Sequence, residues 1–121
     1  MEQVAEFVGD RGVIHPMHPA IVDSLVIDAS KALKAGTVLK AGASGALPAA
    51  DADTPVYVLA EDVDASAEAR PARCVRHGTV VAARLIDASG NTEVAASAAL
   101  TGKLPAAGIY PVQGFDVTKM A

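Results

Sequence analysis

The apolar part of this chain consists almost entirely of small aliphatic side chains, and this limits the possible fold more than any other feature. Apolar residues make up 51% of the 121 residues, but 26 are alanine and 15 are valine, whereas aromatic residues account for only 3%. Small side chains bury little area each, and burial contributes only about 25 cal/mol per Å². A chain of this length forms one domain around a single compact core. We therefore expect a modestly stable subunit that gains from association with neighbouring subunits.

The charge and the remaining composition argue against several classes of protein. The net charge is −4, from 10 basic and 14 acidic residues. Because these residues are spread along the chain, the sequence shows no basic patch that could bind nucleic acid. The single cysteine, Cys74, excludes an intrachain disulfide and is typical of a reducing cytoplasm. No stretch approaches the roughly 18 apolar residues of a membrane span, and Glu2 and Glu6 lie where a signal peptide carries basic residues. The sequence predicts a soluble protein made in a cytoplasm, with neither nucleic acid nor membrane as a partner.

Turn-forming residues divide the chain into three parts. Residues 1–20 are predicted to form an extended N-terminal arm, because Pro16 and Pro19 withhold backbone donors from any regular element. Residues 21–112 are predicted to form a β domain, and residues 113–121 a loose C-terminal tail.

Short runs of β-branched and apolar residues predict the strands of this domain. The predicted strands are residues 21–28, 37–41, 56–60, 73–77, 79–86 and 109–112. Gly78 separates the fourth of these strands from the fifth, and a glycine inside a strand pattern often marks a bulge or bend. The segments 42–54 and 61–71 are predicted to be loops. Residues 30–36 are expected to form a polar connection or a single helical turn.

One short helix is predicted near the C-terminal end of the domain. Asn91 or Thr92 can cap a helix that runs from residue 93 to about residue 101, with Gly102 ending it. Ala96, Leu100 and Leu104 are spaced four residues apart, so that this face of the helix can pack on the sheet.

Two histidines in the arm suggest a metal site. His15 and His18 lie close together in sequence, and imidazole is a common zinc ligand. However, no cysteine is near, and Pro16 and Pro19 prevent the helix that usually aligns paired histidines. An exposed histidine pair is the better interpretation, and no metal site is predicted.

Cys74 and His77 could form a thiolate and its base. Residues three apart on a regular strand point to opposite faces, so the two could meet only if Gly78 or a bulge distorts the strand. A buried structural cysteine is the preferred interpretation, because free cysteine packs as a small apolar side chain.

Acidic residues cluster in the two predicted loops, and a calcium site or a carboxylate pair for acid–base catalysis would use such residues. These residues are Asp51, Asp53, Glu61, Asp62 and Asp64. Their spacing does not fit an EF-hand, which requires a glycine and a terminal glutamate that are missing here. Solvated loops are therefore the preferred interpretation. No catalytic residue, cofactor or metal is predicted, and the chain is not expected to be an enzyme.

The order of segments in the domain resembles that of the head decoration proteins of lambda-type bacteriophages. The similarity rests on KAGTVL at residues 34–39, PVYVLAEDVDA at 55–65, VRHGTV at 75–80 and GIYPV at 108–112. It implies a mainly β (α+β) fold: a small, compact barrel-like or tulip-like β domain with one or two short helices and an extended N-terminal arm. It also implies a structural virion protein that reinforces the head shell as a trimer at three-fold positions on its outer surface. The implied partners are the major capsid protein and further copies of the chain, after synthesis in the cytoplasm of a bacterial host.

The same resemblance implies that the arm helps to bind the capsid. Its apolar residues would otherwise be exposed to water, and an extended segment can add a strand to a sheet edge of a partner. The predicted capsid-binding residues are Val4, Phe7, Val8, Val13, Ile14, His15 and His18.

Two alternatives remain open from the sequence. The first is another structural phage component, such as a tail or head-completion protein. The second is a small ligand-binding or enzymatic β domain that uses the acidic loops or Cys74.

Overall fold

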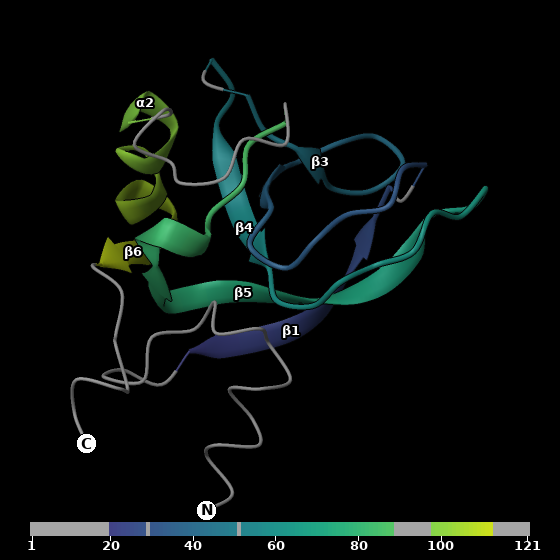
Figure 1. The fold of residues 1–121 in the computed structure, drawn as a ribbon, viewed down its shortest axis with the longest axis horizontal. Coiled ribbons are helices and arrows are strands. Elements are labelled where there is room, and N and C mark those ends of the chain that lie inside the picture. The colour runs from purple at the N-terminus through teal and green to yellow at the C-terminus, as the bar shows by residue number, and fades with distance from the viewer. Residues whose placement is uncertain (1–19, 29, 51, 89–97, 113–121) are drawn as a thin grey trace, which may run out of the picture.

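Strand β5 (Arg70–Val81) is the longest element of the fold, and three other strands pair with it. In this computed structural model, the residues described are 20–28, 30–50, 52–88 and 98–112. The other strands in these ranges are β1 (Ile21–Ile27), β2 (Val38–Lys40), β3 (Leu47–Pro48), β4 (Pro55–Leu59) and β6 (Ile109–Val112). The helical segments are short: η1 (Ala82–Arg84), α2 (Ala98–Thr101) and η3 (Leu104–Ala107). The fold is thus mostly β with few helical residues, which confirms the predicted fold class (Figure 1).

The strands follow the order β1-β5-β4-β2-β3, and each neighbouring pair is antiparallel. The two ends of this path meet at Ala46, the residue before β3. The Ala46 N–H donates to the Val26 carbonyl at 3.0 Å, and the Ala46 carbonyl accepts from the Asp28 N–H at 2.9 Å. Gly45 allows this approach, because its φ is +128° and a Cβ there would lie 2.8 Å from the Ile27 carbonyl carbon. These contacts close the path of strands into a small barrel.

Two apolar clusters lie on the two faces of the barrel wall. Successive side chains of a strand point to opposite faces, and neighbours such as Val58 and Leu59 are both fully buried in different clusters. The inner cluster receives side chains from around the ring: Ile27, Leu39, Ala46, Leu59, Val63, Ala72 and Cys74. The outer cluster lies against the helical segments and β6, and it includes Val38, Val58, Val75, Val80, Leu100, Leu104 and Ile109. Burial on both faces explains why the central strands have continuous apolar runs in the sequence.

Strand β5 differs from its prediction. The sequence predicted two extended segments interrupted by Gly78, but β5 is one strand of 12 residues. Gly78 (φ +132°) is the position where the pairing partner changes: β1 pairs with β5 up to His77, and β6 pairs in parallel from Gly78 onward. The predicted extension to residue 86 was also wrong, because η1 follows directly after Val81.

A register shift between Ile21 and Val22 leaves Arg76 as the extra residue of β5. Val75 and Val80 are five residues apart and would face opposite ways on a regular strand, yet both belong to the outer cluster. The bulge explains this, because one extra residue reverses the alternation of the side chains that follow it.

Most of the other predicted elements lie where the sequence placed them. Strands β1, β2, β4 and β6 match predictions within one residue at each end. The segment 42–54, predicted as a loop, contains the two-residue strand β3. Helix α2 ends at Thr101, directly before Gly102, and both Leu100 and Leu104 are fully buried as predicted. The predicted helix caps and Ala96 lie outside the residues described.

Candidate interaction surface

The predicted capsid-binding residues all belong to the part of the arm that lies outside the residues described. These are Val4, Phe7, Val8, Val13, Ile14, His15 and His18. The description begins at Ala20, directly before β1. The surface around this point is therefore the described part of the domain that lies nearest to the arm in sequence.

Exposed aromatic and apolar side chains gather where β1 begins. Ile21 is 52% exposed and pairs in register with His77 of β5, and Tyr110 of β6 is 47% exposed. The His77 and Tyr110 rings contact each other edge to face, with centroids 6.4 Å apart. We call Ile21, His77 and Tyr110 the arm-root patch.

Gly108 fixes the position of the imidazole in this patch. It ends η3 in the left-handed region, at φ +84°, and its N–H bonds to the Pro105 carbonyl at 3.0 Å. A Cβ on this residue would lie 2.5 Å from His77 Nδ1. The imidazole therefore packs directly on the backbone of the turn that leads into β6. The sequence analysis did not select this patch, because its three members come from three separate strands.

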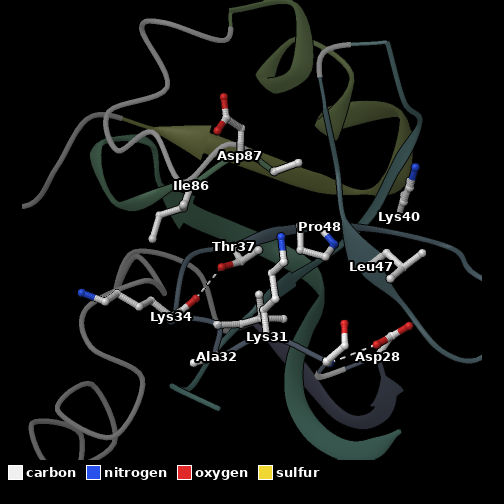
Figure 2. A pocket seen from close by; sticks show the side chains of 13 residues that line it. Asp28, Lys31, Ala32, Lys34, Thr37, Lys40, Leu47, Pro48, Ile86 and Asp87 are labelled. Carbon is white, nitrogen blue, oxygen red and sulfur yellow. Dashed lines mark hydrogen bonds between the residues drawn. The ribbon is translucent and has the colours of Figure 1, made fainter. Parts of the chain in front are cut away.

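An open pocket lies elsewhere, between residues 28–34, β2, β3 and residues 86–88 (Figure 2). Lys31, Lys34 and Lys40 line it together with apolar side chains that include Leu47 and Ile86. Lys40 forms an ion pair with Asp53 at 3.1 Å. Thr37 Oγ1 donates to the Lys34 carbonyl at 2.6 Å, and the Asp28 carboxylate accepts from the Ser30 N–H at 3.1 Å. Opposite charges on an apolar wall can hold a polar ligand, but this pocket has no histidine or cysteine among its lining residues.

Cys74 lies in the inner cluster and is fully buried, which confirms the prediction of a structural cysteine. Its thiol is directed to the Ala72 carbonyl, at 3.7 Å. Burial, with a smaller contribution from the Glu61 carboxylate, raises the pKa of Cys74 to about 12. A bulge does distort β5 near His77, as a thiolate–base pair would require, but the imidazole packs against Tyr110 and Gly108. A thiol that remains protonated at neutral pH is not a nucleophile.

Three of the five acidic loop residues accept hydrogen bonds from backbone N–H groups. Asp53 accepts from Ala50 at 2.8 Å, Glu61 from Arg73 at 2.6 Å, and Asp62 from Ala35 at 2.9 Å. The hydrogen bond from the Ala50 N–H, and then Lys40, lower the pKa of Asp53. Asp51 lies outside the residues described. Within the described ranges, no group of three or more His, Cys, Asp or Glu side chains is placed to hold a metal ion.

The same ranges contain no helix that is both long enough and apolar enough to cross a membrane.

Replacing Cys74 tests its structural role. Cys74→Ser is expected to lower the free energy of unfolding by about 1–3 kcal/mol, because it places a hydroxyl in an apolar site. Cys74→Ala is expected to cost less, since it introduces no polar group. Urea denaturation measures both values. If folded Cys74→Ala failed to bind its partner, the residue would have a function besides packing.

A small β barrel with an exposed aromatic patch, a buried thiol, and three loop carboxylates bonded to backbone N–H groups has the features of a structural binding module. The family model for the head decoration protein D of bacteriophage lambda matches residues 13–109, which is more than half of the chain. The chain therefore belongs to this family of phage head decoration proteins. Comparison with curated proteins gave no match, and comparison with solved structures gave none either.

Family membership confirms the resemblance and defines a structural phage protein that binds the capsid of the virion. The matched region begins at Val13, so it includes the predicted binding residues Val13, Ile14, His15 and His18. Val4, Phe7 and Val8 precede it.

Proposed function

We propose that the protein binds the outer surface of a phage head as a homotrimer at three-fold positions and reinforces the shell. The family match over residues 13–109 carries this proposal, because it covers the β domain as far as the first residue of β6, together with the adjoining part of the arm. The partner is the major capsid protein, and the protein reaches it after synthesis in the cytoplasm of the bacterial host. Reinforcement requires only binding energy across neighbouring shell subunits, and no chemical step.

The composition of the core supports association between copies. The buried apolar residues of the described ranges are alanine, valine, leucine, isoleucine and cysteine, without an aromatic ring. Aromatic side chains bury roughly 150–250 Å² each and contribute strongly to core energies. A core without them leaves a small domain with limited stability, and contacts between subunits offset this limit.

The arm is the proposed binding element. Residues 1–20 would order on the shell by adding a strand to an exposed sheet edge, with Val4, Phe7, Val8, Val13 and Ile14 buried against it and His15 and His18 at the contact. Main-chain hydrogen bonds would supply affinity, and the alternating side chains would supply specificity.

Decoration of purified heads tests the site and the stoichiometry. Expanded heads without decoration protein are mixed with the full-length chain, and a reconstruction of the particles is expected to show trimers over the three-fold positions. The decorated heads should also resist heat or chelation better than bare heads, because each trimer links several shell subunits. Isolated single copies or dimers on the shell would contradict the trimer. Binding to tails in place of heads would favour a different structural role.

A further inference from the structure

We propose that the arm-root patch, formed by Ile21, His77 and Tyr110, is a second contact of this protein with the head-shell subunit. The inference rests on the proposed function of the arm. It assigns part of the interface to the folded domain.

The short connection between arm and domain determines which face of the domain lies near the shell. An extended chain spans at most about 3.3–3.6 Å per residue. His18 is three residues from Ile21, so a bound His18 holds the start of β1 within roughly 11 Å of the shell. Ile14 is seven residues away, which allows roughly 25 Å. The domain surface next to Ile21 is therefore the one that the bound arm brings to the capsid.

The side chains on that surface suit a protein interface. Only three large apolar or aromatic side chains in the described residues are exposed, namely Ile21, Val26 and Tyr110, and two of them belong to the patch. Tyrosine is enriched where interface energy concentrates, because it combines a large apolar ring with a polar hydroxyl. The His77 ring contacts the Tyr110 ring edge to face. The His77 ring itself packs on the backbone at Gly108. The patch is therefore preorganised, which lowers the cost of ordering it on binding.

The patch also continues toward the other end of the chain. Tyr110 lies in β6, which ends at Val112, two residues after the patch. β1 begins on the side of the domain where β6 lies (Figure 1). Val26 lies at the far end of β1 from Ile21 and pairs with Pro71.

Val26 provides a matched control, because it lies on the same strand as Ile21 and is 55% exposed. Full-length Ile21→Ser, Tyr110→Ser and Val26→Ser are compared with the wild type by co-sedimentation with expanded heads. We expect Ile21→Ser and Tyr110→Ser each to weaken binding about tenfold or more, as truncation of interface residues does. Val26→Ser should change the dissociation constant by no more than about twofold. Circular dichroism and melting curves identify any variant that has lost its fold. If Ile21→Ser is unfolded, Tyr110→Ser still tests the patch.

Three other outcomes would overturn the assignment. If the wild type binds heads and both patch variants bind as Val26→Ser does, the patch is not an interface, although the proposed function stands. If the patch variants lose self-association in parallel with head binding, the patch faces a second copy and not the shell. If the wild type does not bind heads at all, the proposed function itself fails.

Discussion

Removing residues 2–14 should leave the domain folded and weaken its binding to expanded heads by at least about a hundredfold. Both core clusters are built from residues between Ala20 and Ile109, so the far-ultraviolet circular dichroism spectrum and the melting temperature should change little. The deletion removes Val4, Phe7, Val8, Val13 and Ile14. Burial of one such side chain contributes roughly 1.5–3 kcal/mol, so losing even two of them exceeds the effect of a hundredfold change. Co-sedimentation with heads measures the dissociation constant.

A variant of the polar arm residues provides the control for this deletion. Glu6→Ser with Asp10→Ser keeps the length and the apolar residues of the arm, and it should bind heads nearly as well as the wild type. Ordering the arm costs roughly 1–2 kcal/mol per residue fixed, so the main-chain hydrogen bonds and the buried apolar side chains together must exceed this cost for the arm to bind. Equal binding by the truncated and full-length chains would place the whole interface on the folded domain.

Gly36→Ala should lower the stability of the domain strongly, because it adds a methyl group where the backbone leaves no room for one. Gly36 is buried in the turn before β2 and has φ +100°, a conformation that side chains rarely adopt. A Cβ there would overlap the Arg84 carbonyl oxygen, which is a backbone atom and cannot rotate away. The Gly36 N–H also donates to Leu59 at 2.7 Å, and its carbonyl accepts from Ile86 at 2.9 Å. We expect a loss of roughly 3 kcal/mol or more in the free energy of unfolding, measured by urea denaturation.

Gly102→Ala is the matched control for this substitution. Gly102 is exposed in the turn after α2 and is not among the glycines with positive φ. Its replacement should change the free energy of unfolding by no more than roughly 0.5 kcal/mol. If Gly36→Ala lowered the free energy of unfolding by no more than the roughly 0.5 kcal/mol expected of Gly102→Ala, the turn at Gly36 would adjust almost without cost.

The bulge in β5 shows where sequence-based reasoning loses precision. The alternation of side chains predicted that Cys74 and His77 face opposite ways, and the extra residue at Arg76 removes that rule between them. The conclusion that Cys74 is structural remained correct, because it rested on the burial of small apolar residues and not on register. Gly78 was correctly identified as a special position, but its role is to permit a change of partner strand and not to end the strand.

The sequence by itself determined most of the extended segments and some of the buried residues. β-branched runs located β1, β2, β4 and β6, and the spacing of Leu100 and Leu104 identified the face that packs on the barrel. These features depend on the local conformational preference of each residue and on the spacing of apolar residues, and both can be read from neighbouring positions in the sequence. Its resemblance to a family of phage proteins, carried by short motifs, was confirmed over residues 13–109.

Only the tertiary structure decided how these segments combine. The barrel closes through Ala46 and Val26, β6 joins β5 in parallel, and Ile21, His77 and Tyr110 meet at the root of the arm. Each of these contacts joins residues 20 or more positions apart, and no local pattern encodes such a pairing. Strand register and bulges depend on the whole set of packed strands. The same is true of the close backbone approaches at Gly36 and Gly45, because each contact forms only when the other strands are in place.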